Sequence, residues 1–392
     1  MPAFRFQVAH GLLAAYALDR ALRLVALERF FRRPAPPLPQ NWPAVTLIQP
    51  VTRASHDLRR ALASRTRLAY AGPQRHLLVC DQADGQSQRM VRELIAAHPN
   101  WDAKLLVVAP DAGTVASKIA KLLAALPYAD GAVLAFIDDD VSLPPDALTT
   151  LVRHLGAPGV GATFGLACYT AWESPWSSLM SLFVNAWALP SYVPLSLLTE
   201  PYTITGHCYA LRREVFAAAG GFTGMAGRID DDHELARRVR ALGLRCEQTP
   251  LIYTVENRLP TARAYHAQLR RWFIIPRQTM LPSLSPKESA LSALGSIGNW
   301  LPPLVSVLAL LRRRRDASLA ALICLALFLG LYAYVDRRYL QRVTPWRRWP
   351  LLPVTALITP AQIVAASLGD EVIEWRGQRI RVRRGERAEV VE

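Results

Sequence analysis

The fold is decided by Val133-Leu134-Ala135-Phe136-Ile137-Asp138-Asp139-Asp140. An apolar run of strand length leads directly into three consecutive carboxylates, which repel one another unless a cation or a basic partner neutralises them. A helix N-cap or a turn before Pro144-Pro145 is the alternative interpretation of such a triplet. Because a core strand leads straight into these acids, the sequence favours a cleft at the end of that strand.

Strand-like and helix-like segments alternate around this stretch. The strands are predicted at 44–48, 75–80, 104–108 and 132–137, and the helices at 56–66 and 86–97. Such alternation is typical of a mostly parallel sheet that binds ligands at the carboxyl ends of its strands. We therefore predict an α/β fold with a Rossmann-like sheet.

Two further acidic clusters lie where a strand or a turn is expected to end. Asp81 and Asp84 follow the strand predicted at 75–80, and Asp230, Asp231 and Asp232 precede a stretch of helical spacing. Capping of that helix is the structural alternative for the second of these clusters. In the functional interpretation, Asp232 points into the cleft and accepts a proton from a substrate hydroxyl group.

A helix predicted over 261–275 carries Gln268, Arg271 and Trp272 at positions i, i+3 and i+4, which places them on one face. Arginine can bind a diphosphate with two parallel hydrogen bonds, and tryptophan offers a flat surface to a sugar ring or a lipid. An interfacial Arg/Trp pair beside a membrane is the alternative.

The composition points to a membrane. The chain has a formal net charge of +15 and 51% hydrophobic residues. Clusters of arginine flank apolar segments near the C-terminus, where they can meet lipid headgroups, at 312–315, 337–338, 342, 347–348 and 376–387. Without a nucleic-acid-binding motif, nucleic acid is the weaker interpretation of this charge. The five cysteines show no CxxC spacing, so we expect buried free thiols.

The sequence divides into four predicted parts, and a stiff proline-rich linker at 34–39 separates the first two. We expect an N-terminal membrane anchor or interfacial helix over 1–33, a catalytic domain over 40–285, membrane-associated segments over 286–370 and a basic tail over 371–392. The uncharged runs 289–311, 317–335 and 349–369 are each long enough to cross a bilayer. Prolines interrupt the uncharged run 174–199, which favours an apolar acceptor groove or a membrane-dipping region.

Taken together, these elements resemble the family 2-type inverting glycosyltransferases of the GT-A fold, and among them the ceramide glucosyltransferase-like group, which includes bacterial enzymes acting on hopanoids and other lipids. The resemblance covers roughly residues 40–280. It rests on the three acidic clusters and on Gln268 to Trp272, together with Ser117-Lys118-Ile119, the segment 98–105 and Trp375-Arg376-Gly377. The first acidic motif, Asp81-Gln82-Ala83-Asp84-Gly85, departs from the usual consecutive acids of the group, so the choice between Asp81 and Asp84 stays open.

The resemblance implies a role for each candidate residue. On the donor side, Asp81 or Asp84 would bind the uracil-ribose end, Lys118 the nucleotide or its phosphates, and Asp138 with Asp139 the diphosphate. Asp138 and Asp140 would hold Mg²⁺ or Mn²⁺. Asp232 would be the catalytic base, and His207 would help to shape the acceptor site. The closure over donor and acceptor would come from Asp231, Gln268, Arg271 and Trp272.

The implied reaction transfers glucose or N-acetylglucosamine from a UDP-sugar to the hydroxyl group of a ceramide-, hopanoid- or glycerolipid-like acceptor, with inversion at the anomeric carbon. A polyprenyl-phosphate sugar transferase and a processive polysaccharide synthase would share these motifs, and a non-catalytic membrane scaffold is a third alternative. Because nucleotide sugars are cytosolic, we expect a bacterial inner-membrane protein whose catalytic domain faces the cytoplasm. The basic loops at 312–315 and 336–348 flank one predicted span, so the charge rule does not fix the orientation of the spans.

Overall fold

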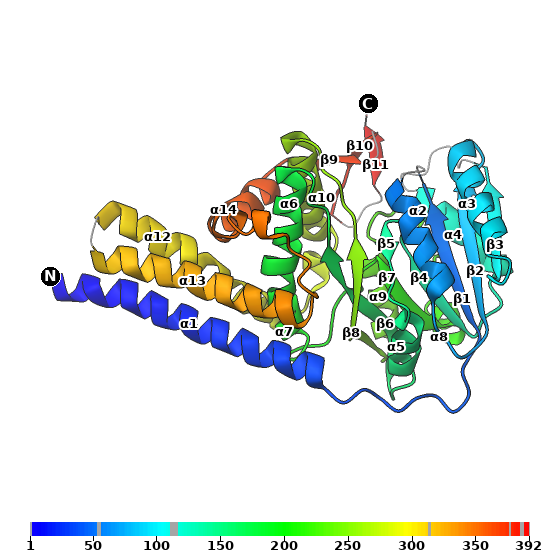
Figure 1. Ribbon diagram of the computed structural model, residues 1–392, viewed down its shortest axis with the longest axis horizontal. Coiled ribbons are helices and arrows are strands. Elements are labelled where there is room, and N and C mark those ends of the chain that lie inside the picture. The colour runs from blue at the N-terminus through cyan, green and yellow to red at the C-terminus, as the bar shows by residue number, and fades with distance from the viewer. Residues whose placement is uncertain are drawn as a thin grey trace.

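The computed structural model describes residues 2–52, 56–109, 117–312, 315–375, 378–384 and 388–391. Within these residues, an eight-stranded sheet of order β3-β2-β1-β4-β7-β6-β8-β5 forms the central layer (Figure 1). The strands are β1 Val45–Val51, β2 Gln74–Asp81, β3 Ala103–Val108, β4 Val133–Ile137, β5 Val141–Ser142, β6 Val160–Tyr169, β7 Cys208–Arg212 and β8 Arg245–Val255. The helices that cover this sheet are α2 His56–Ala63, α3 Gly85–Ala97, α4 Ser117–Ala125, α5 Ala147–Leu155, α8 Arg213–Ala218 and α9 Asp231–Ala241.

The first half of the sheet is parallel, as the alternation of strands and helices predicts. β1 pairs in parallel with β2 on one side and with β4 on the other, while β7 runs antiparallel to β4 and β6. The chain therefore changes direction across the sheet at β1 and β4, and ligands of open α/β sheets bind at such a point. The sheet is mixed as a whole, and the predicted α/β class is confirmed.

Strand β4 supplies side chains to both faces of the sheet. Val133, Ala135 and Ile137 pack in a core with α5, whereas Leu134 and Phe136 pack in a second core with α4, α8 and α9. Successive side chains of a strand point to opposite faces, so a strand that is apolar at every position must be covered on both sides. This double coverage fixes the end of β4, and hence the acids that follow it.

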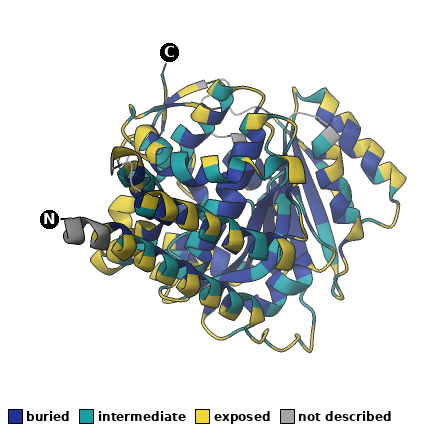
Figure 2. Cartoon of the chain, turned by 60° about the vertical axis from the view of Figure 1, so that its left-hand side comes forward, coloured by how far each residue is buried: buried dark blue, intermediate teal, exposed yellow. Residues whose placement is uncertain are grey.

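The remaining helices form an extension on one side of the sheet (Figure 1). They are α1 Pro2–Arg32, α6 Pro175–Leu182, the π-helix η3 Phe183–Ala188, α7 Leu189–Leu195, α10 Ala262–Gln278, α11 Pro286–Ile297, α12 Leu301–Arg312, α13 Arg315–Arg338 and α14 Leu351–Ser367. Helices α1, α12 and α13 pack side by side and project away from the sheet. Figure 2 shows many exposed residues along these long helices, and several of them are large and apolar, including Leu304, Leu310, Leu311, Leu319 and Leu322.

The uncharged run 174–199 lies largely inside the protein. Its helices α6, η3 and α7 pack between β6 and the long helices α1 and α13. The side chain of buried Asn185 both accepts a hydrogen bond from the backbone N–H of Tyr169 and donates one to its carbonyl oxygen, each at 2.8 Å. Most of this run is therefore an internal support, and it does not form an open groove along its length.

Residues near the C-terminus form a small sheet of order β11-β10-β9, from the strands β9 Val372–Trp375, β10 Gln378–Arg381 and β11 Glu389–Val391. This sheet packs on α10 through a cluster that contains Ile274, Ile373 and Ile380. The segment that we predicted as a basic tail thus has regular structure. In the motif at 375–377, residues 376 and 377 lie outside the described residues. The division of the chain into four parts stays a prediction.

Candidate active site

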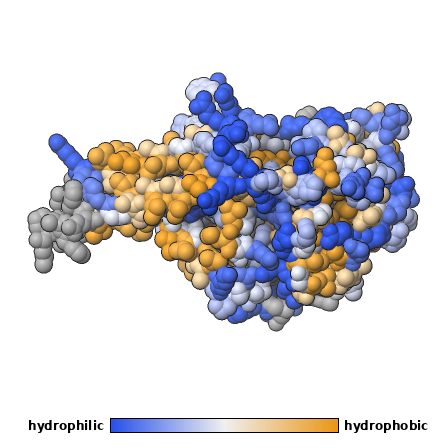
Figure 3. Space-filling view, turned by 90° about the horizontal axis from the view of Figure 1, so that it is seen from below, coloured by the Kyte–Doolittle hydropathy of each residue, from blue (hydrophilic) through white to orange (hydrophobic). Residues whose placement is uncertain are grey.

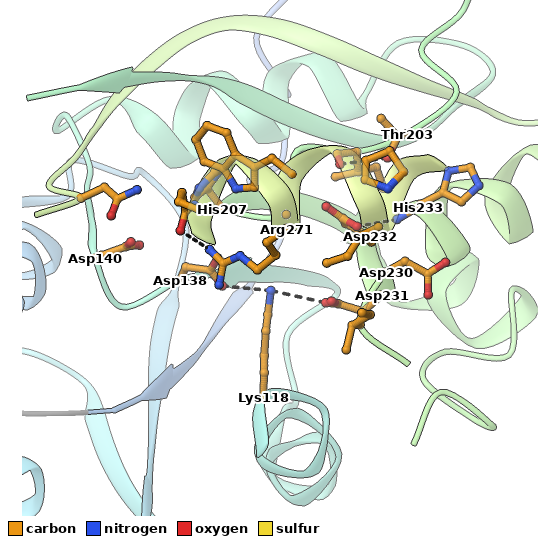
Figure 4. A pocket seen from close by; sticks show the side chains of 18 of the residues that line it. Lys118, Asp138, Asp140, Thr203, His207, Asp230, Asp231, Asp232, His233 and Arg271 are labelled. Atoms are coloured by element: carbon orange, nitrogen blue, oxygen red, sulfur yellow. Dashed lines mark hydrogen bonds and ion pairs between the residues drawn. The ribbon is translucent and has the colours of Figure 1, made fainter. Parts of the chain in front are cut away.

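A cavity of about 910 Å³ opens at the ends of β1 and β4. Its walls come from the acidic triplet at 138–140 that follows β4, from the N-terminal ends of α4 and α9, from the residues before β7 and from one face of α10 (Figure 4). The cavity therefore collects segments that are far apart in the sequence. The acidic clusters at 138–140 and 230–232 and the motif at 268–272 meet in this cavity.

Lys118 joins two of the acidic clusters. Its Nζ atom lies 3.0 Å from Oδ1 of Asp138 and 3.3 Å from Oδ2 of Asp231 (Figure 4). Burial lowers the pKa of this lysine, but the carboxylates of Asp138 and Asp231 outweigh that effect and hold the pKa well above its usual value. Lys118 therefore places a fixed positive charge in the middle of the cavity.

The other two acids of the triplet differ in their surroundings. Oδ2 of Asp139 accepts hydrogen bonds from the backbone N–H and the hydroxyl group of Thr52, at 2.7 and 2.9 Å, and this ties the end of β1 to the end of β4. Asp140 is an exposed residue that lines the cavity. Desolvation by the protein atoms around its carboxyl group, together with the charges of Asp138 and Asp139, raises the pKa of Asp140 to about 7.

Asp138 and Asp140 fit a divalent cation by the chemistry of their donor atoms. Both carboxyl groups line the cavity, and carboxylate oxygens are the ligands that Mg²⁺ and similar cations prefer. Among the described residues, no group of three or more acidic, histidine or cysteine side chains is arranged to hold a metal ion. Mg²⁺ often binds one or two carboxylates and completes its shell with substrate phosphates and water, so two aspartates suffice.

The third acidic cluster lies at the start of α9. Asp230 is buried and forms an ion pair with Arg228, with 2.7 Å between Nη2 and Oδ2. Asp232 lines the cavity, and its Oδ1 accepts a hydrogen bond of 2.8 Å from the N–H of His233. Burial and the charge of Asp231 raise the pKa of Asp232 to about 7, although Lys118 acts in the opposite direction. A carboxyl group with such a pKa is suited to act as a general base near neutral pH.

The face of α10 predicted from spacing does line the cavity. Gln268, Arg271 and Trp272 all belong to its wall, and Nη2 of Arg271 donates a 2.8 Å hydrogen bond to Oε1 of Gln268. The ring of Trp272 lies edge-on to that of Tyr169, with 5.8 Å between centroids. The helix thus presents a planar cation and an aromatic surface to the same space.

His207 also lines the cavity. Its Nε2 atom lies 3.3 Å from the hydroxyl oxygen of Tyr169, and its backbone oxygen accepts a hydrogen bond from the N–H of Asp138. Burial lowers the pKa of His207 below its usual value, so the imidazole is neutral at physiological pH. A neutral imidazole can either donate or accept a hydrogen bond with a bound hydroxyl group.

Asp81 and Asp84 lie outside the lining of this cavity. The side chain of Asp84 caps α3 by accepting a 3.0 Å hydrogen bond from the N–H of Ser87. Asp81 instead forms an ion pair with Lys121, with 2.6 Å between Oδ2 and Nζ. The two residues therefore differ: Asp84 is a helix cap, and Asp81 is an ion-paired acid at the end of β2. Their assignment to the nucleotide stays a prediction.

Sequence reasoning did not identify Lys121 or Gly206. Lys121 is 1% exposed, and its Nζ atom also donates to the backbone oxygen of Val51. Its position three residues after Lys118 could have suggested a common face of one helix. Gly206 lines the cavity directly against Asp232. Its only signal in the sequence is its place directly before His207.

Solved structures with this architecture include sugar-transferring enzymes. The mannosyltransferase PcManGT from Pyrobaculum calidifontis, in complex with GDP-mannose and Mn²⁺, matches with 19% identity and a TM-score of 0.52, covering 92% of this chain and 99% of its own. GalNAc-T7 with UDP, GalNAc and Mn²⁺ matches with 13% identity and a TM-score of 0.44, covering 67% and 56% of the two chains. The first of these similarities supports the fold.

The fold is thus that of the GT-A type. The chain belongs to glycosyl transferase family 21, whose family model matches residues 11–388. This match confirms the expected membership in the ceramide glucosyltransferase-like group. It also extends the resemblance well beyond residues 40–280, into both the N-terminal helix and the C-terminal sheet.

Proposed function

We propose that the protein transfers glucose or N-acetylglucosamine from a UDP-sugar to the hydroxyl group of a membrane lipid, with inversion at the anomeric carbon. The observation that carries this proposal is the position of Lys118, which lies between Asp138 and Asp231 and so brings two acidic clusters into one cavity. A displacement reaction needs a group that binds the leaving diphosphate and a base for the attacking hydroxyl within one site.

The donor side of the proposed site consists of Lys118, Asp138 and Asp140, with Asp139 bracing the ends of two strands. When bound, a divalent cation such as Mg²⁺ or Mn²⁺ held by Asp138 and Asp140 would neutralise charge on the diphosphate. Lys118 would exchange its contact with Asp138 for one with a phosphate oxygen, because its ammonium group forms strong hydrogen bonds with phosphate. The relative from Pyrobaculum calidifontis holds GDP-mannose with Mn²⁺, which supports a nucleotide sugar and a cation of this kind.

The acceptor side needs a base, and Asp232 is the proposed one. In the reaction, its carboxylate takes the proton of the lipid hydroxyl as that oxygen forms a bond with the anomeric carbon. The bond between the anomeric carbon and the diphosphate oxygen breaks, and UDP leaves with the additional negative charge. Lys118 and Arg271 stabilise this charge, since both cationic groups line the cavity.

A lipid acceptor is supported by the apolar extension beside the catalytic domain. Within the described residues, the helical segments Pro286–Leu311 and Arg315–Arg338 are long and apolar enough to cross a membrane. The third predicted span forms the shorter helix α14. Figure 3 shows hydrophobic residues gathered over the projecting helices and hydrophilic residues over much of the remaining surface. Since α10 packs against α14, one wall of the cavity adjoins this extension.

The proposal is tested by incubating the detergent-solubilised protein with total bacterial membrane lipids, Mn²⁺ and a panel of labelled UDP-sugars. We expect a labelled lipid that carries one sugar, its loss when EDTA is added, and its recovery with excess Mn²⁺ or Mg²⁺. The variant Asp232→Asn should transfer about 10²–10⁴-fold more slowly while it still binds UDP. Asp102→Asn, which changes an exposed aspartate remote from the cavity, is the matched control.

Two results would contradict the proposal. Label in an insoluble polymer, or on a polyprenyl phosphate alone, would assign a different acceptor to the same cavity. Transfer by Asp232→Asn at the rate of the control would exclude Asp232 as the base.

A further inference from the structure

Helix α10 has a second functional face, which turns away from Gln268, Arg271 and Trp272. Arg263, Arg270 and Arg277 lie on it at intervals of seven residues. Residues seven apart on an α-helix differ by only about 20° around the axis, so these arginines form one row along the helix. Arg270 lies within the motif at 268–272, directly before Arg271, and neither the motif nor the proposed chemistry assigns it a role.

Each arginine of this row holds a different part of the segment 367–374. Arg277 donates hydrogen bonds to the backbone oxygens of Ser367 and Gly369, the latter at 3.4 Å. Arg270 donates from Nη2 to the oxygens of Asp370 and Val372, both at 3.2 Å. Arg263 forms an ion pair of 2.7 Å with Oε1 of Glu374. The order of contacts shows that this segment runs antiparallel to α10.

The backbone of the segment 367–374 passes close to the guanidinium group of Arg270. A Cβ atom on Gly369 would collide with this group, so a larger residue here would push the end of the Arg270 side chain aside. The small size of Gly369 therefore favours the hydrogen bonds that Arg270 donates to the backbone oxygens of Asp370 and Val372.

The segment 367–374 reaches the cavity. Its last contact residue, Glu374 of β9, is one of the cavity-lining residues, although it lies more than 100 positions after the motif at 268–272. The sheet that contains β9 is also fixed beyond α10, because the N–H of Ala388 donates a 3.0 Å hydrogen bond to the oxygen of Gly227, close before the acidic cluster at 230–232. Figure 1 shows this sheet beside α10.

We propose that Arg263, Arg270 and Arg277 hold β9 as a wall of the active-site cavity, so that Glu374 contacts the polar head of the acceptor. This inference rests on the proposed function for the identity of the acceptor. Arg270 is then a positioning residue, and Glu374 is a residue that determines acceptor specificity. The Glu374 carboxylate accepts hydrogen bonds and, oriented by Arg263, it suits the hydroxyl groups of a lipid headgroup.

The kinetic test compares the full-length wild-type protein with Glu374→Gln, Arg270→Gln and Arg270→Lys, at saturating UDP-sugar and varied lipid. We expect Glu374→Gln and Arg270→Gln to raise the KM for the lipid about threefold to tenfold, as for the loss of one or two hydrogen bonds, with a smaller change in kcat. Arg270→Lys should recover much of this loss, because lysine also donates to carbonyl oxygens. The control is Glu93→Gln, which removes an equally exposed ion pair of Arg59 outside the cavity.

A second measurement separates this inference from the proposed function. Amide hydrogen exchange of residues 370–374 should be faster in Arg270→Gln than in the wild type and in Glu93→Gln. Kinetics of Glu374→Gln identical to those of Glu93→Gln would overturn the role of Glu374, and unchanged exchange in Arg270→Gln would overturn the role of the arginine row. If the wild type glycosylates no lipid, the proposed function has failed, and the exchange result alone decides whether the arginines hold this wall.

Discussion

Gly206 packs directly against the carboxylate of Asp232. A Cβ atom on residue 206 would lie 2.9 Å from Oδ2 of Asp232, closer than real Cβ atoms approach a neighbour, and 3.2 Å from its Cβ, which is tighter than most real contacts. The backbone of Gly206 does not have a positive φ, so space and not conformation requires a glycine here. Gly206, two residues before β7, thus limits where the carboxylate of the proposed base can lie.

Gly206→Ala should displace the Asp232 carboxylate while the rest of the fold stays intact. We expect kcat to fall about 100-fold, because a displacement of about 1 Å in a reacting group can cost this much. Gly330→Ala is the matched control, since a Cβ at residue 330 meets no atom within 4 Å. Initial rates and thermal unfolding of both variants would check this. A Gly206→Ala enzyme with the control's rate would show that the carboxylate needs no such precise placement.

The pH dependence of transfer should report the raised pKa of Asp232. A base acts in its deprotonated form, so kcat/KM should rise with pH through a midpoint near 7, remain high above it and fall as the pH decreases below it. The charge of Asp231 raises this pKa, so Asp231→Asn should move the midpoint to lower pH. Profiles of kcat/KM for both proteins would test the shift, and a midpoint that stays in place would remove Asp231 as its cause.

Much of the fold could be predicted from local pattern. Fully apolar runs such as Val133 to Ile137 require cover on both faces, and the alternation of strands and helices correctly predicts that β1 to β4 are parallel. The antiparallel β7 and the sheet at the C-terminus are different, because their pairing depends on contacts between distant segments. No periodicity in the segment 371–392 indicates that Ile373 and Ile380 would pack on α10.

In the candidate site, too, local pattern predicts some features, and contacts between distant segments determine the others. Helical spacing predicted the common face of Gln268, Arg271 and Trp272, and all three line the cavity. Spacing could not predict that Lys118 would bridge Asp138 and Asp231, since those residues come from three separate elements. A contact of this kind is a consequence of tertiary packing.

Asp81 and Asp84 should differ in what their loss does to stability. Asp81→Ala leaves the charge of Lys121, which is 1% exposed, without its carboxylate partner and should cost about 3 kcal/mol of unfolding free energy. Asp84→Ala removes the cap of α3 and should cost about 1 kcal/mol. Chemical denaturation would measure both, with the double variant Asp81→Ala/Lys121→Met as the control that removes the buried charge. If this double variant is no more stable than Asp81→Ala, the unpaired charge is not the source of the loss.

The charge of Lys118 should shift the pKa of Asp232 in the direction opposite to that of Asp231. The positive charge of Lys118 lowers the pKa of Asp232, so Lys118→Met should raise that pKa and move the midpoint of kcat/KM to higher pH. The same change removes a cationic group from the donor side, so the KM for the nucleotide sugar should increase as well. A pH profile at saturating donor separates the two effects, because saturation removes the loss in binding while the midpoint shift persists. If Lys118→Met leaves the midpoint unchanged, or lowers it as Asp231→Asn is expected to do, then the charges of Lys118 and Asp231 do not act on a common base in this cavity.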